Sequence, residues 1–144
     1  MFRALLLAAV LPAQQHLPTI VVHAPKATLT LQVAKTESER ELGLMSVTKL
    51  PVHTGMVFVF DEDAQIEFWM KDTLVPLDMV FVAADGTVRN VAAKVPVVAT
   101  DTPDDKIPRR DGTAKYVIEL PSGEARCDGI VPGTKLRDLA GLHT

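Results

Sequence analysis

Two apolar runs enclose the segment Phe68-Trp69-Met70-Lys71-Asp72-Thr73-Leu74-Val75-Pro76-Leu77-Asp78-Met79. This segment contains the only tryptophan of the chain and two of its five methionines, together with one lysine and two aspartates. Proline has no N–H for a ladder hydrogen bond, so the backbone is expected to turn at Pro76. Residues 55–60 are apolar on both faces, which is typical of a strand that is covered on both sides. Residues 78–83 form a further expected strand beyond the turn.

Other stretches have the period of two that is typical of strands. Residues 19–23 are β-branched and short, as in an edge strand, and residues 27–34 and 65–71 alternate. Asp85-Gly86 favours a tight hairpin turn between residues 78–83 and 87–94. The alternation of residues 115–120 predicts one inward and one outward set: Tyr116, Ile118 and Leu120 inward, and Lys115, Val117 and Glu119 outward.

Helical signals are few. Thr36 and Glu39 have the spacing of a capping box, which predicts a helix of about two turns at residues 37–44. Residues 124–128 are expected to form one helical turn, residues 61–63 a turn, and the polar residues 100–113 a long loop. The pattern predicts a mainly β, β-rich α+β fold: a compact single-domain barrel or sandwich with one or two short helices.

Length and charge limit the classes of function. A chain of 144 residues argues for one domain, expected at residues 18–144. The formal net charge of −3 provides no basic field for a phosphate backbone, so no nucleic-acid partner is expected. Residues 1–17 are interpreted as a signal peptide and N-terminal arm, because Arg3 precedes a short apolar run. The protein is therefore expected to be exported, periplasmic or secreted, with no membrane span after signal removal.

The motifs resemble one known family. Glu39-Arg40 with Gly43-Leu44-Met45, the segment 68–79 and Ala114-Lys115-Tyr116-Val117-Ile118-Glu119-Leu120 stand in the order and spacing of the uncharacterised prokaryotic family catalogued as domain of unknown function 192. The resemblance covers about residues 28–138. It implies a compact β-rich domain, often exported, and no known activity. The chain has Asp72 where the family usually has asparagine and Leu42 where it usually has arginine, which weakens the case for an anionic ligand.

The central segment is the candidate site. An indole beside amino, carboxylate and hydroxyl groups is suited to holding a small polar ligand, because the ring supplies apolar area and the polar groups fix orientation. The expected occupant is sugar-like or an organic anion, or else a protein partner; a structural alternative is that Lys71 forms a salt bridge with Asp72 or Asp78. The candidate ligand-binding residues are Arg40, Trp69, Lys71, Asp72, Thr73, Asp78 and Lys115.

Two other interpretations remain open. In a hydrolase-type enzyme, Asp72 and Asp78 would act as acid and base, aided by Lys71 or Lys115. In a Cu(I)-binding protein, thioethers would combine with His23 or His53, although methionines in apolar runs usually fill cores; the methionines in question are Met45, Met56, Met70 and Met79. No cofactor, metal or catalytic residue is assigned. The single cysteine, Cys127, cannot form an internal disulfide.

Overall fold

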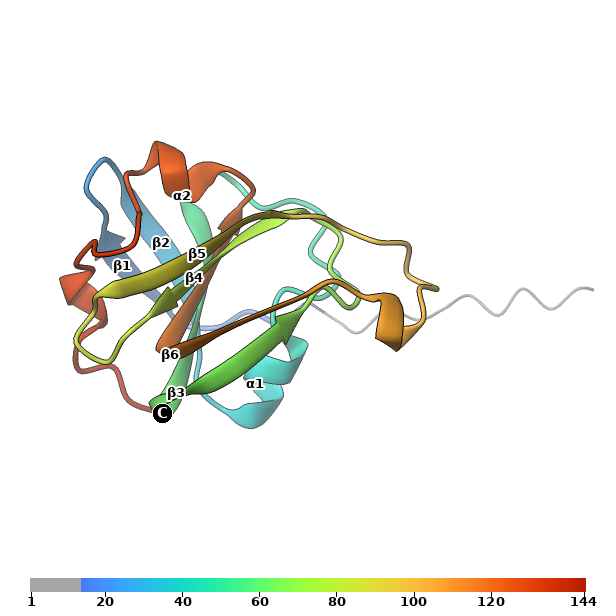
Figure 1. Ribbon diagram of the computed structural model, residues 1–144, viewed down its shortest axis with the longest axis horizontal. Helices are drawn as coiled ribbons and strands as arrows, with labels where there is room; N and C mark the ends of the chain where they lie inside the picture. Colours follow the sequence, from blue (N-terminus) through green and yellow to red (C-terminus); the bar gives the residue numbers. More distant parts are fainter. Residues whose placement is uncertain (1–13) are drawn as a thin grey trace, which may run out of the picture.

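The computed structural model describes residues 14–144 as one six-stranded sheet with short helices. The expected signal peptide lies largely in residues 1–13, outside the described residues. In chain order the elements are β1 (Thr19–His23), β2 (Thr28–Ala34), α1 (Glu37–Leu42), β3 (Thr54–Trp69), β4 (Leu77–Val82), β5 (Val88–Val95), the 3-10 turn η1 (Asp104–Lys106), β6 (Arg109–Pro121), α2 (Glu124–Cys127) and the 3-10 turn η2 (Arg137–Leu139). The strand order is β1-β2-β3-β6-β4-β5, an open sheet (Figure 1).

The connections follow from the sequence signals. The side chain of Thr36 accepts a hydrogen bond from the backbone N–H of Glu39, and Glu39 reaches back to the backbone N–H of Thr36, so the expected capping box starts α1. The β2–β3 pair is parallel, and all other pairs are antiparallel. Parallel neighbours need a crossover connection, and α1 lies within it. Gly86 has φ +86° in the β4–β5 turn, a conformation that glycine adopts at little cost.

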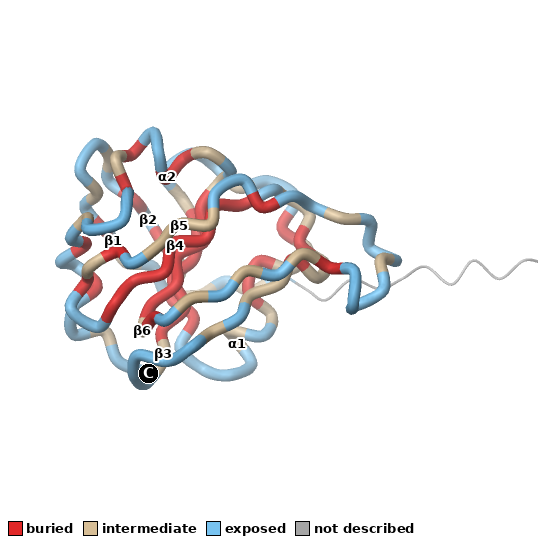
Figure 2. Tube along the Cα trace, viewed as in Figure 1, coloured by how far each residue is buried: buried red, intermediate tan, exposed pale blue. Residues whose placement is uncertain are grey.

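The last strand in the sequence, β6, lies in the middle of the sheet between β3 and β4. Both faces are buried in β4, in the first part of β3 and in the second part of β6, as Figure 2 shows by their red segments. On one face, alternate residues such as Val57, Ile118 and Val80 pack with Ala125 of α2. The other face forms a second core, whose members include Phe58, Met56, Met79, Phe81 and Val117.

The second core lies on the side of α1, and α1 and α2 lie on opposite sides of the sheet (Figure 1). Leu44 and Val47, which follow α1, close this core, as does Ile107 after η1. Beyond the core, β3 and β6 continue as a paired ribbon that is mostly exposed or half-buried (Figure 2). In the described residues, no helix has the length and apolar character needed to cross a bilayer.

The β-rich fold with two short helices confirms the predicted class, and the strands form one open sheet. Three local predictions are wrong. Residues 61–63 are not a turn, because β3 runs through them with an irregularity in its pairing to β6 between Val59 and Ala64. Residues 109–113 belong to β6 instead of a loop. Val117 and Glu119 do not point into solvent, because the second core covers their face of the sheet.

Candidate functional site

A cavity of about 370 Å³ lies between α1 and the second face of the sheet. Four of the seven candidate residues line it: Arg40 from α1, Trp69 at the end of β3, and Lys71 and Thr73 just beyond. Its other walls are formed by the turn after α1, by the β3 aromatic residues and by Glu119 of β6. The volume lies within the range of small-molecule sites.

Glu119 lines the cavity and is also buried in the protein interior. It is 5% exposed and stands on the central strand, in register with Met56 of β3 on one side and Met79 of β4 on the other. Within the described part of the chain, no group donates a hydrogen bond to its carboxyl. Burial in these apolar surroundings raises the pKa of Glu119 from 4.5 to about 8. The carboxyl is therefore protonated at neutral pH and can both donate and accept a hydrogen bond.

Aromatic rings form the apolar wall of the cavity. The rings of Phe58 and Phe68 meet edge to face with their centres 4.8 Å apart, and the Phe60 ring lies 6.4 Å from Phe68. Trp69 is half-buried beside them. Edge-to-face contacts of this kind stabilise a fixed arrangement of rings, so the wall is preorganised before any ligand binds.

The cations of the cavity already have partners. Lys71 Nζ lies 2.9 Å from Asp104 Oδ1 and 4.9 Å from the centre of the Trp69 ring. Arg109, the cross-strand neighbour of Trp69, places its guanidinium carbon 4.8 Å from the same ring and pairs with Glu67 at 2.8 Å. These contacts leave no cation dedicated to an anionic ligand.

Arg40 is also engaged. Its Nη1 donates to the backbone carbonyl of Val59 at 3.0 Å and to that of Lys35, and its guanidinium carbon lies 4.9 Å from the centre of the Phe60 ring. The residue therefore ties α1 to β3. It contributes to the shape of the cavity more than to a free positive charge.

The other three candidates lie outside this cavity. Lys115 Nζ lies 5.6 Å from the centre of the Tyr116 ring. The carbonyl of Asp72 accepts a hydrogen bond from Ser46 N at 3.0 Å, and its φ of +50° marks a tight backbone turn. Asp72 and Lys115 therefore do not line the cavity with Trp69 and Lys71, although they are close in the sequence or share an expected face.

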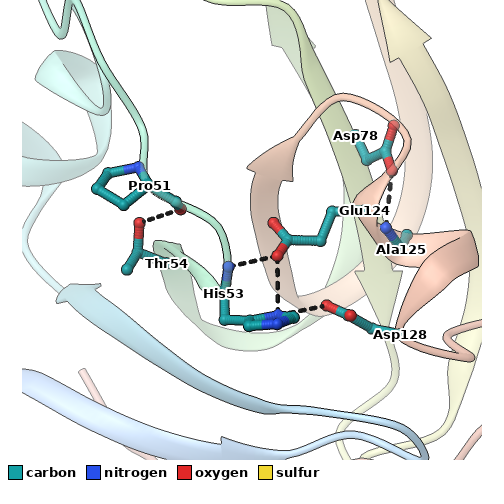
Figure 3. A network of polar contacts seen from close by, with 7 residues as sticks. All are labelled: Pro51, His53, Thr54, Asp78, Glu124, Ala125 and Asp128. Atoms are coloured by element: carbon teal, nitrogen blue, oxygen red, sulfur yellow. Dashed lines mark hydrogen bonds and ion pairs between the residues drawn. The ribbon is translucent and has the colours of Figure 1, made fainter.

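Asp78 is a structural carboxylate. It is fully buried, and its Oδ1 accepts hydrogen bonds from the backbone N–H groups of Lys94 and Gly123 at 2.8 and 2.9 Å. Its Oδ2 accepts from Ala125 N at 2.9 Å, as Figure 3 shows. Three backbone donors fix the carboxylate between β5 and α2. The geometry therefore does not support Asp72 and Asp78 as an acid–base pair, because they do not share a cavity.

A second polar cluster lies at α2. Nδ1 of His53 lies 2.9 Å from Glu124 Oε1 and 3.3 Å from Asp128 Oδ2, and the backbone N–H of His53 also donates to Glu124 Oε1 (Figure 3). Burial raises the pKa of Glu124, and the hydrogen bond from His53 opposes that shift. No local sequence motif predicts this cluster, since 71 residues separate His53 from Glu124.

The methionine site is not supported by the contacts of its members. Met56, Met70 and Met79 are buried in the second core among aromatic and aliphatic side chains. His53 instead contacts two carboxylates, and His23 Nδ1 lies 3.2 Å from Asp138 Oδ2. These three methionines fill the core, as their apolar sequence surroundings indicate, and Met45 is half-buried at the cavity.

Comparison with known proteins gives a consistent picture. Residues 19–137 match the model of domain of unknown function 192, described as Uncharacterized ACR. No curated protein matches the chain. A crystal structure from Sinorhizobium meliloti 1021, provisionally described as a transcription regulator, is similar at 31% identity and a TM-score of 0.74, over 86% of this chain and 96% of that one.

A second solved structure, a protein of unknown function from Novosphingobium aromaticivorans DSM 12444, is similar at 30% identity and a TM-score of 0.68. The alignment covers 89% of this chain and 92% of that chain. The family model spans most of the sequence, including every strand from β1 to β6. The chain therefore belongs to the uncharacterised family known as domain of unknown function 192.

Proposed function

We propose that this protein is a binding module that holds a small, neutral, polar ligand of the sugar-like class in the cavity beside α1. The observation that carries the proposal is Glu119, a protonated carboxyl that lines the cavity from the middle of the sheet without a hydrogen-bond partner among the described residues. Because this carboxyl faces the cavity, a ligand hydroxyl could donate a hydrogen bond to it or accept one from it.

The charges of the cavity favour a neutral ligand over an anion. Lys71 is paired with Asp104, and Arg40 is bound to backbone carbonyls. Glu37, Glu41 and Glu67 also line the cavity, so acidic groups outnumber basic ones around the opening. An organic anion would compete with Asp104 for Lys71 and would approach the acidic groups, so its binding is disfavoured.

The aromatic wall suits the apolar face of a sugar ring. Trp69 and Phe68 provide flat apolar area, and Thr73 and Glu119 provide hydroxyl and carboxyl groups that can fix an orientation. The cavity thus combines apolar ring area with polar groups, the two features needed to hold and orient a small polar ligand.

The sole tryptophan makes a direct test available. Trp69 emission is measured while neutral mono- and disaccharides, peptidoglycan fragments and dicarboxylates are titrated into the folded protein. We expect a saturable change with at least one neutral compound and none with the dicarboxylates. A flat titration across the panel contradicts the proposal, and a response to dicarboxylates alone indicates an organic-anion site.

Two substitutions separate hydrogen bonding from shape. Glu119→Gln keeps a donor and an acceptor, so affinity for a neutral ligand should change less than about tenfold. Glu119→Leu removes both and should weaken binding by about 1–3 kcal/mol, roughly 5- to 150-fold. Lys115→Met, outside the cavity, is the control. Equal affinity for the Leu and Gln variants would contradict the role of Glu119.

We further propose that the domain acts outside the cytoplasm and does not bind nucleic acid. The support is the basic residue and short apolar run near the N-terminus and the formal net charge of −3. Cell fractionation with N-terminal sequencing tests export: recovery of the uncut chain in the cytoplasm contradicts it. A mobility-shift assay at low salt tests whether the protein binds nucleic acid. Specific retardation of duplex DNA would contradict the proposal and would agree with the description of the Sinorhizobium relative as a transcription regulator.

A further inference from the structure

We propose that His53, Glu124 and Asp128 bind a divalent transition-metal ion, such as Zn²⁺ or Mn²⁺, at a site separate from the cavity beside α1. The three residues come from the loop before β3, from α2 and from the residue after α2. They offer one imidazole nitrogen and two carboxylate oxygens that all lie within 4.8 Å of one another.

The spacing matches a coordination shell. Ligand atoms about 2.1 Å from a metal lie roughly 3.0 Å apart in octahedral geometry and about 3.4 Å apart in tetrahedral geometry. Nδ1 of His53 lies 2.9 Å from Glu124 Oε1 and 3.3 Å from Asp128 Oδ2. A metal ion could therefore sit among these atoms after small side-chain rotations, without movement of the backbone.

A second observation, an unpartnered buried oxygen of Glu124, points to a bound ion at this site. Glu124 is 7% exposed, its carboxylate points at the His53 ring (Figure 3), and its Oε2 is buried without a hydrogen-bond partner. Buried polar atoms nearly always have partners, so this oxygen requires an explanation. A metal ion that both Glu124 oxygens bind, after a small rotation of the carboxylate, provides one.

Charge and support favour a cation at this place. Glu124 and Asp128 are both buried. Among the described residues, the His53 imidazole is the only side chain able to carry a positive charge that contacts them. The nearby Asp78 is saturated by three backbone N–H groups, which hold β5 and the start of α2 in place. The backbone N–H of His53 donates to Glu124, so two of the ligands are already oriented.

The site is open on one side. His53, Glu124 and Asp128 line a surface groove of about 790 Å³, and the His53 side chain is 47% exposed. Three protein ligands with an accessible side leave positions for water or a small ligand. Imidazole nitrogen favours transition metals over Mg²⁺ and Ca²⁺, which prefer oxygen ligands alone.

The test is calorimetric titration of the full chain with ZnCl₂, MnCl₂ and MgCl₂ in a non-chelating buffer, with circular dichroism as the check on folding. We expect one equivalent of Zn²⁺ or Mn²⁺ to bind at least about tenfold more tightly than Mg²⁺. Absence of binding to the folded protein overturns the proposal, and so does equal affinity for Mg²⁺.

Matched variants locate the ion. His53→Asn tolerates the φ of +61° at this position but removes the imidazole, and Glu124→Gln keeps an acceptor for the His53 backbone N–H. Each should weaken binding at least about tenfold. His23→Asn is the control, because His23 pairs with a single exposed carboxylate, Asp138. Unchanged affinity in the His53 and Glu124 variants overturns the proposal.

A thiol control excludes capture by cysteine. Cys127 is exposed and lines the same groove, and a thiolate is a strong Zn²⁺ ligand. Cys127→Ser should retain the affinity of the original chain. Loss of binding in this variant would assign the ion to the thiol and overturn the site at His53.

Discussion

Gly55 of β3 lies directly against the backbone of Glu119 on β6: a Cβ atom at Gly55 would come within 2.0 Å of the Glu119 carbonyl oxygen. Real Cβ atoms do not approach a backbone atom so closely, and neither strand can move, because both are buried between two cores. Glycine at residue 55 therefore allows β6 to pack close to β3, and this packing positions Glu119 in the cavity.

Gly55→Ala should destabilise the protein by at least about 3 kcal/mol, because the β3–β6 pair must separate to accept the methyl group. Urea unfolding monitored by Trp69 fluorescence measures the change. Gly133→Ala is the control: φ is +93° there but nothing lies within 4 Å, so backbone strain alone should cost about 1–2 kcal/mol. Similar losses for the two variants would contradict the contact.

Glu119 should make stability fall as pH rises. Burial raises its pKa from 4.5 to about 8. Between these values the folded state holds a proton that the unfolded state has lost, so the free energy of unfolding decreases with pH, by at most about 1.4 kcal/mol per pH unit. Above the folded-state pKa this dependence ends.

The side chain introduced by Glu119→Gln does not titrate, so this variant should lack the pH-dependent contribution of Glu119 to stability. Urea midpoints of both proteins are compared at pH 5, 7 and 9, where groups common to the two chains cancel. The variant should gain stability relative to the original chain as pH rises. Parallel pH profiles would show that the carboxyl ionises normally.

Asp78→Asn should cost about 3–5 kcal/mol, because the amide replaces one acceptor oxygen with a donor that faces backbone N–H groups. Asp72→Asn is the matched control. Its φ of +50° suits asparagine as well as aspartate, so the change should stay within about 0.5 kcal/mol. Chemical denaturation measures both; equal losses would contradict the structural role assigned to Asp78.

Thr36→Ala should remove the N-cap of α1 and destabilise the protein by about 1 kcal/mol. Thr36→Ser keeps the hydroxyl and should restore most of the loss. Because α1 carries Glu37, Arg40 and Glu41 along the cavity, hydrogen exchange of its amides should accelerate in the Ala variant only. Unchanged exchange would indicate that Arg40 alone holds the helix.

Some local signals predicted the local structure correctly, although the turn expected at residues 61–63 was wrong. The capping box at Thr36 and Glu39, the Asp85-Gly86 hairpin and the helical turn before Gly129 all depend on residues close in sequence, and each is present. The β-rich class follows from the same alternation of apolar residues. These features are decided within a few residues, so the sequence expresses them directly.

Features that depend on distant residues were not predictable in this way. No pattern in the sequence indicates that β6 lies between β3 and β4. For this reason Glu119 was predicted to point outward, whereas it is buried. The one available signal was an acid in an otherwise apolar strand that α1 could cover. The cluster of His53 with Glu124 and Asp128 joins positions 71 and 75 residues apart, which no spacing motif describes.

The central position of β6 also has a consequence for biosynthesis. A ribosome delivers β1 to β5 before residue 109 appears, and until then β3 and β4 each present an unpaired edge. Unpaired edges invite association with other chains. A nascent chain stalled at this stage should need a chaperone that covers the free edges of β3 and β4. A chain released with β6 can fill the gap between these strands and complete the sheet.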